Sequence, residues 1–249
     1  KQDLLALAVP VLVDRLLNPN CVATDSSLGC TTPSDCSSLG SGAQCDATGN
    51  GGRGQCFVAG DDGGGDNQCK SITGTKPEFE PVHDMHVGIV NSSLGGAGGD
   101  ACPGTVDQDD KAHLLNRTPS GSVANAKPVA GDGGNFLAWL PASDPKNAGK
   151  TPPNVTPYGD GQETTLVTDF TSLIKGVGQV GCGLEAQLES WYRFLVQPDP
   201  YDSLDGGGGS AVTYSGIDST LLKERHDFLR PDSLVAMIQL THEEDSWSD

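Results

Sequence analysis

The chain has 249 residues, a formal net charge of −18 and only 15 lysine and arginine residues. Nucleic-acid binders gain affinity by neutralising phosphates with basic side chains, so this balance argues against a nucleic-acid partner. Hydrophobic residues make up 35% of the chain, whereas glycine (34) and proline (16) are frequent, so apolar burial must be concentrated in a few segments joined by long loops. No apolar run approaches the roughly 18 residues that a transmembrane helix needs.

The first predicted element is an amphipathic helix near the start of the chain. Leu5, Val9, Leu12 and Leu16 recur at helical spacing and define one apolar stripe. Pro10 lies within this stretch, and proline removes a backbone donor from the helical ladder. We therefore expect a kinked helix.

A cysteine-rich insert follows at residues 20–72. An even number of cysteines in a stretch of Gly, Ser, Asp and Asn predicts a disulfide knot, since little apolar core can form there. Six cysteines allow about 15 pairings, which the sequence leaves open. Disulfides indicate an oxidising compartment, so we expect a periplasmic, cell-surface or secreted protein. The six are Cys21, Cys30, Cys36, Cys45, Cys56 and Cys69.

Two metal sites are alternatives within the insert. Zinc is disfavoured because no cysteines have CxxC spacing and no histidine lies in the segment. Asp61, Asp62 and Asp66 offer oxygens to calcium, but the terminal Glu of an EF-hand is missing, and a solvated loop explains them more simply. Cys102 and Cys182 either bridge each other or have partners outside this sequence.

Helices and strands are predicted to alternate in the rest of the chain. Residues 85–90 and 136–140 have strand character, and most of 102–162 is expected to be an excursion loop. Apolar residues at helical spacing predict helices at 166–177, 184–195 and 221–229.

The last predicted element is a buried strand at Leu234–Leu240. Its nearly continuous apolar run is typical of a strand covered on both faces of a parallel sheet. Alternating helices and strands favour an α/β fold with a Rossmann-like, mainly parallel sheet flanked by helices. We expect one domain over residues 1–249 that contains the 20–72 insert.

A hydrolase of unrecognised type is the alternative to a binding protein. Ser92 or Ser93 lies near His83 and His86, yet no G-x-S-x-G elbow is present, and the histidines precede the serines on one strand. Metal-bound catalysis is a second form of this alternative, although no H-E-x-x-H motif occurs. Solvated acidic surfaces explain its candidates more simply. They are His113 near Asp107, Asp109 and Asp110, and His242 near Glu243, Glu244 and Asp245. His226, near Arg225 and Asp227, is a candidate general base, and a surface position on a polar helix face explains it more simply.

Three segments carry a resemblance to a known family. They are DMHVGIVNSSLG at 84–95, GCGLE at 181–185 with WYRFL at 191–195, and FLRPDSL at 228–234. Together they resemble the von Willebrand factor A-like domains of bacterial exported lipoproteins. The resemblance implies a non-catalytic adhesion module that binds a protein or cell-surface ligand through a divalent cation, Mg²⁺ or Ca²⁺, held by hydroxyl and carboxylate oxygens.

The resemblance also implies where the cation ligands lie. The family's D-x-S-x-S loop is followed by a pair like Lys1-Gln2, so we expect that main ligand loop to precede residue 1 and to be absent from this chain. His242 stands where the family has Asp, and Ser246 stands where relatives carry Cys, which leaves Cys102 or Cys182 without a partner. The remaining candidate metal ligands are Glu185, Thr241, Glu243 and Asp245. Glu185 also fits the first turn of a helix without any metal.

Overall fold

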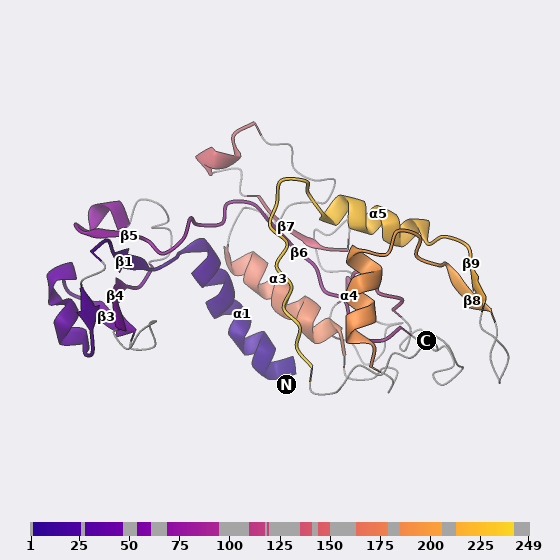
Figure 1. Cartoon of the computed structure of the whole chain (residues 1–249), viewed down its shortest axis with the longest axis horizontal. Helices are drawn as coiled ribbons and strands as arrows, with labels where there is room; N and C mark the ends of the chain where they lie inside the picture. Colours follow the sequence, from indigo (N-terminus) through magenta and orange to yellow (C-terminus); the bar gives the residue numbers. More distant parts are fainter. Residues whose placement is uncertain are drawn as a thin grey trace. The chain divides into compact units, whose positions relative to one another are not determined.

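The structure, a computed structural model, describes residues 2–25, 28–46, 54–60, 69–94, 110–117, 119, 135–140, 144–149, 163–178, 185–205 and 213–241 (Figure 1). The chain divides into two compact units. We call Leu7–His83 the cysteine-rich unit, and Lys1–Ala6 with Asp84–Asp249 the larger unit. Helix α1 (Gln2–Leu17) contributes residues to both.

Helix α1 buries the predicted apolar stripe. Val9 is fully buried, and Leu5, Leu12 and Leu16 are half-buried on the same side, with Pro10 inside the helix. The opposite side of α1 is also apolar but exposed. Its large side chains are Leu4, Leu7 and Val11, each at least 70% exposed.

The cysteine-rich unit is built on an antiparallel five-stranded sheet of order β2-β4-β1-β5, in which β3 also pairs with β4. A 3-10 helix, η1 (Pro33–Leu39), packs beside it. The strands are β1 (Cys21–Ala23), β2 (Gly29–Cys30), β3 (Ala43–Asp46), β4 (Gly54–Val58) and β5 (Thr75–Pro77).

Three disulfides cross-link this unit, which confirms the predicted knot and selects one pairing. The bridges are Cys21–Cys69, Cys30–Cys45 and Cys36–Cys56. Its buried cluster consists of Ala23, Leu39 and half-cystines of these bridges. The sulfurs therefore form most of the core that the apolar side chains are too few to build.

Glycine is required where β4 meets its two neighbours. A Cβ atom at Gly54 would lie 2.4 Å from the carbonyl oxygen of Asp46 and 2.9 Å from the sulfur of Cys45. Cys45 and Cys56 are direct partners across β3 and β4, yet each is bonded to a different cysteine. Two bridges thus lie close together, and the backbone at Gly54 approaches them more closely than any side chain allows.

The larger unit contains three helices and two short antiparallel strand pairs among its described residues. Strand β6 (Met85–Val87) pairs with β7 (Leu137–Trp139), and β8 (Ser203–Asp205) pairs with β9 (Thr213–Ser215). The helices confirm the predicted positions. They are α3 (Glu163–Gly176), α4 (Gln187–Leu195) and α5 (Ser219–Phe228), with a short 3-10 turn η3 (Pro145–Asn147).

Aromatic rings join these elements in the core of the larger unit. Phe136 contacts Phe228 edge-on with ring centroids 5.5 Å apart, and Phe194 contacts Phe228 in a similar way at 5.8 Å. Residues before β7, in α4 and at the end of α5 therefore meet at one point. Leu114 and the fully buried Leu221 belong to the same cluster.

The predicted parallel, Rossmann-like sheet is wrong. All the strand pairs of the described residues are antiparallel, and β6 and β7 form only a two-stranded ribbon. Leu234–Leu240 has no regular secondary structure and is exposed along its length. Its apolar run was interpreted as a covered strand, but the described residues supply neither a pairing strand nor a cover.

The helices of the described residues include none that combines the length and apolar character required to cross a bilayer.

The disulfides predict how the cysteine-rich unit responds to reduction. Replacing the Cys21–Cys69 pair with serines should cost about 4 kcal/mol, because it opens the longest loop, whereas replacing Cys30–Cys45 should cost about 3 kcal/mol. Thermal unfolding of both double variants, with and without dithiothreitol, measures this. Equal unfolding temperatures for the oxidised and reduced wild type would contradict the prediction.

Candidate functional site

The predicted cation ligands are not brought together by the described structure. Glu185 lies before the N-cap residue Ala186 of α4 and not in the first turn of the helix, and it accepts a hydrogen bond from the hydroxyl of Ser92. Thr241 is exposed at the end of the described residues. Glu243 and Asp245 lie outside the described residues, as do His242, Ser246, Asp61, Asp62, Asp66, Cys102 and Cys182.

Ser92 and Glu185 belong to a polar junction between loops. The backbone nitrogen of Ala186 donates to the carbonyl of Ser92 over 3.0 Å, so the start of α4 is fixed to residues 91–93 by a backbone and a side-chain bond. On the other side, Asn91 donates to the carboxylate of Asp110. The junction thus already supplies partners to the oxygens that a cation would need.

Arg117 holds the neighbouring part of this junction. Its guanidinium forms a forked pair with Asp110, with N–O distances of 2.7 and 3.1 Å. It also donates to the backbone carbonyls of Gly176 and Val177 at the end of α3, at 2.8 and 3.2 Å. A charged side chain therefore completes the C-terminal end of a helix, where carbonyl oxygens lack partners.

A second polar cluster, which we call the His113 network, is buried between loops, α4 and α5. His113 contacts Asp218 through Nε2 at 2.9 Å and Glu224 through Nδ1 at 3.1 Å. Glu224 also accepts hydrogen bonds from the Asn135 side chain, at 2.6 Å, and from the Leu114 backbone. Two carboxylates on one imidazole favour its doubly protonated, charged form.

Arg193 completes the His113 network. Its side chain is only 1% exposed, and it pairs with Asp218 at 3.2 Å. It further donates to the backbone carbonyls of Lys111 and Tyr201, and its guanidinium lies 4.2 Å from the Tyr201 ring centroid. A buried charge is tolerated when it is paired and hydrogen-bonded. These contacts supply partners to Nε and Nη2, whereas Nη1 is buried without a hydrogen-bond partner among the described residues.

The His113 network raises the pKa of its histidine. Burial by itself lowers the pKa of His113, but the hydrogen bonds and negative charges of Glu224 and Asp218 together outweigh burial and raise the pKa above its ordinary value of 6.5. Since both ring nitrogens are held by carboxylates, His113 is arranged as a cationic cross-link and not as a base facing a nucleophile.

The pKa of His86 is shifted in the opposite direction to that of His113. Burial, with the charge of Arg230 adding to it, lowers its pKa below 6.5 despite the hydrogen bond to the carbonyl oxygen of Phe228. That carbonyl accepts from Nδ1 at 2.7 Å, so Nδ1 carries the proton in the neutral ring. The ring also packs on Phe136 at a centroid distance of 4.6 Å.

These contacts do not favour the hydrolase alternative. Ser92 donates to Glu185, and His86 donates to a backbone carbonyl, so this serine and this histidine are not arranged as nucleophile and base. His226 is 88% exposed on α5, as expected of a surface residue.

Three cysteine sulfurs lie close enough together to suggest a metal site. The Sγ atoms of Cys30, Cys36 and Cys45 are within 4.8 Å of one another. In the structure, however, Cys30 is bonded to Cys45 and Cys36 to Cys56, so none of the three is a thiolate while the bridges are intact. The adjacent bridges account for this proximity.

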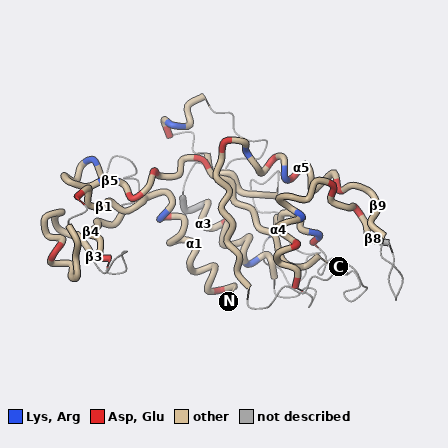
Figure 2. The backbone as a smooth tube through the Cα atoms, viewed as in Figure 1, with Lys and Arg blue, Asp and Glu red and all other residues tan. Residues whose placement is uncertain are grey.

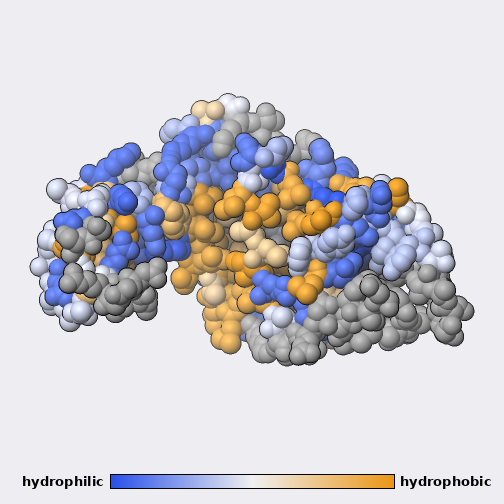
Figure 3. Space-filling model, viewed as in Figure 1, coloured by the Kyte–Doolittle hydropathy of each residue, from blue (hydrophilic) through white to orange (hydrophobic). Residues whose placement is uncertain are grey.

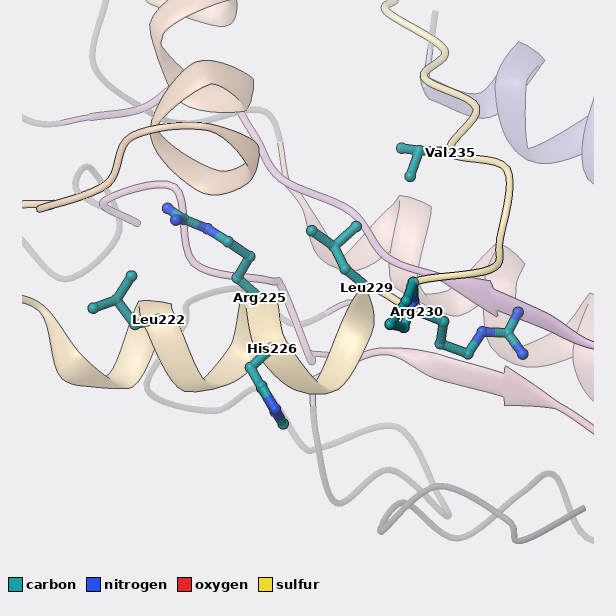
Figure 4. Close-up of a pocket in the computed structure, with 7 residues that line it drawn as sticks. Leu222, Arg225, His226, Leu229, Arg230 and Val235 are labelled. Atoms are coloured by element: carbon teal, nitrogen blue, oxygen red, sulfur yellow. The ribbon is translucent and has the colours of Figure 1, made fainter.

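The sequence did not predict an open, apolar pocket that lies beside α5. Its volume is about 430 Å³, and Figure 4 shows Leu222, Arg225 and Leu229 projecting from one side of the helix while His226 projects from the other. Val235, in the apolar run that follows α5, faces the same space. The full lining is Leu222, Arg225, His226, Leu229, Arg230, Pro231 and Val235.

Arg225 gives this pocket a positive charge. Its guanidinium donates to the backbone carbonyls of Phe194, at 2.5 Å, and Arg193, at 2.8 Å, and it pairs with no carboxylate among the described residues. Burial and the nearby charge of Arg193 lower the pKa of Arg225. The lining includes no acidic side chain, in a chain whose net charge is −18. Of its other basic residues, Arg230 pairs with Asp84, and His226 projects from the other side of α5.

The exposed segment beside the pocket is uncharged and apolar. We call Leu234–Leu240 the exposed segment; no Lys, Arg, Asp or Glu occurs between residues 233 and 241 (Figure 2). Hydrophobic residues gather on the visible surface where the chain continues beyond α5 (Figure 3). The exposed fractions are 93% for Leu234, 50% for Val235, 50% for Met237, 68% for Ile238 and 63% for Leu240.

No family model, curated protein or solved structure matches this chain.

The pocket was missed because its signal is not local. The sequence predicts a short helix that includes Leu222, Arg225 and Leu229, and helical spacing does place them on one side of α5, with Leu229 as its C-cap. Helical spacing does not reveal that this side remains open beside Val235. The one available signal was Arg225 between two apolar neighbours on the same side of the helix.

The His113 network predicts a pH dependence of stability. Because the folded state binds the His113 proton more tightly than the unfolded state, its contribution is fully present below the unfolded pKa of about 6.5 and is lost as pH rises through the raised folded pKa. Unfolding temperatures measured as the pH rises above the unfolded pKa should therefore fall more steeply for the wild type than for His113→Gln. His226→Gln, a change at an exposed histidine, should behave like the wild type. Parallel curves for wild type and His113→Gln would show that the histidine is not a charged cross-link.

The cation prediction from the family resemblance is tested by titrating Mg²⁺, Ca²⁺ and Mn²⁺ calorimetrically into the oxidised chain. If Glu185 is a ligand, Glu185→Gln should weaken binding by about tenfold or more. Glu189→Gln removes the same charge from α4 and should leave affinity unchanged. The same titrations into a chain extended upstream through the expected D-x-S-x-S loop supply the ligands that this sequence lacks. Absence of binding heat with both chains, or equal affinities for the two variants, would contradict a site at Glu185.

Proposed function

We propose that this chain is a non-catalytic, extracytoplasmic binding module for a protein or cell-surface ligand. The observation that carries the proposal is the exposed segment with the pocket beside it. Fully burying a large aliphatic side chain contributes about 1.5–3 kcal/mol, so exposing several in one run forgoes considerable stabilisation. Contiguous apolar surface of this kind marks interaction sites.

The disulfides support the extracytoplasmic part of the proposal. Such bridges persist in oxidising compartments and are rare where thiols are kept reduced. All the cysteines among the described residues are paired, and together the three bridges account for much of the core of the cysteine-rich unit. The net charge of −18 favours solubility and disfavours adsorption to anionic surfaces.

The arrangement of the polar groups supports binding over catalysis. Ser92, His86 and His113 have partners that stabilise the fold, and the pocket at α5 contains no acidic group to pair with a base. Its chemistry is apolar with a positive charge, which suits recognition. Divalent-cation dependence through Glu185, Thr241, Glu243 and Asp245 stays a separate prediction of the family resemblance.

Selection from a displayed library of random peptides tests the proposed function. Immobilised wild-type chain should enrich peptides that Ile238→Asp does not retain, because a charge in the exposed segment disrupts apolar contact. Val196→Asp places the same charge at another half-exposed apolar side chain, after α4, and should retain the peptides. No enrichment, or equal retention by Ile238→Asp, would overturn binding through this segment.

A further inference from the structure

The beginning of the exposed segment is anchored within the larger unit. Arg230 pairs with Asp84, the residue before β6, and His86 of β6 donates to the carbonyl of Phe228 at 2.7 Å. The backbone nitrogen and hydroxyl of Ser233 donate to the carbonyl of Arg230, at 3.2 and 2.9 Å. The chain is thus fixed up to the residue before Leu234, and the segment continues from a defined point.

The backbone of the exposed segment lacks hydrogen-bond partners among the described residues. No hydrogen bond between described residues reaches the backbone of residues 234–240, and Figure 1 shows them running on from α5 with neither helix nor strand. Backbone donors and acceptors flanked by apolar side chains are what an unpaired edge strand presents. An extended peptide is the partner that can both hydrogen-bond to this backbone and cover its apolar side chains.

The pocket adds a charge requirement to the same surface. Val235 belongs to both the segment and the pocket, and Arg225 lies in the pocket with only backbone carbonyls as described partners. A carboxylate on the bound peptide would complement this guanidinium, and Arg is the side chain best suited to that pairing. The peptide that fits is therefore apolar and carries an acidic side chain.

Resting on the proposed function, we propose that Leu234–Leu240 binds an extended apolar peptide segment by strand addition, with an acidic side chain of that peptide received beside Arg225. The partner class is a protein with an accessible, acidic β-strand. Main-chain hydrogen bonds supply affinity in this mode, and the pocket supplies specificity.

Other occupants fit these observations less well. A helical partner would cover the apolar side chains but leave the segment's backbone unpaired. A second copy that pairs through the same segment would bring no carboxylate to Arg225, because residues 233–241 contain none. Both occupants are outcomes of the experiment below.

The test uses the whole oxidised chain and synthetic peptides of about eight residues, which is within the usual range of strand lengths. One peptide alternates Val and Thr with a central Glu, and a second has Lys in place of the Glu. A third carries the Glu with alternate backbone nitrogens methylated, which blocks strand pairing without altering the side chains. Amide hydrogen exchange over residues 234–240 is the readout.

We expect the Glu peptide to slow exchange in the exposed segment about tenfold or more at saturation, and the Lys peptide to bind about tenfold more weakly. The methylated peptide should give no protection. Arg225→Gln should remove the preference for Glu over Lys, and Lys223→Gln, which removes a positive charge from α5 at a residue outside the pocket lining, should retain it. Because the comparison of peptides on the wild type needs no variant, it remains decisive if Arg225→Gln is unstable.

Equal affinities for the Glu and Lys peptides would overturn the role of Arg225, and absence of protection would overturn strand addition. Protection without peptide that depends on protein concentration, with dimers in sedimentation, would assign the segment to self-association and overturn the proposal. If library peptides depend on Ile238 but no defined peptide slows exchange, the proposed function stands and strand addition fails. If neither the library peptides nor the defined peptides bind, the proposed function and strand addition both fail.

Discussion

The guanidinium of Arg193 is the interaction on which the larger unit most depends. It joins α4 to the residues before β8 and, through Asp218, to the N-terminal end of α5. Asp218 in turn caps α5 by accepting from the backbone nitrogen of Leu221 at 2.9 Å. One buried charge therefore fixes two helices, and removing its partner would leave an uncompensated ion in the core.

Backbone conformation around the same network shows how it compensates for a small apolar core. Lys111, Ala112 and Asn135 have positive φ angles of 49°, 61° and 63°, a region that residues other than glycine seldom adopt. The carbonyl of Lys111 accepts from Arg193, and the side chain of Asn135 donates to Glu224. Polar bonds thus hold loops in the larger unit, as disulfides hold the cysteine-rich unit. Each replaces apolar burial that a chain with so much glycine cannot supply.

The sequence predicted those features that depend on neighbouring residues. Apolar spacing located α1, α3, α4 and α5, and the cysteine count predicted a disulfide knot. Strand pairing joins distant residues, so the run at 234–240 did not reveal whether another strand would cover it. The His113 network could not be predicted either, because it also joins residues that are distant in the sequence: His113 and Glu224 are 111 residues apart. Of the site, Glu185 was found as a polar residue at a helix start, whereas its bond to Ser92 required the fold.

The failed strand prediction is itself informative about function. A long apolar run indicates that a segment is stabilised by burial. It does not indicate which residues or which molecule bury it. In this chain the segment is exposed, its start is anchored through Arg230 and Ser233, and an arginine lies in the pocket at its side. A chain that must bury such a run internally would place it in the core beside Phe136 and Leu221. Among the described residues it lies instead at the surface, next to the positive charge of Arg225, and the proposed binding of an acidic, extended peptide accounts for both observations.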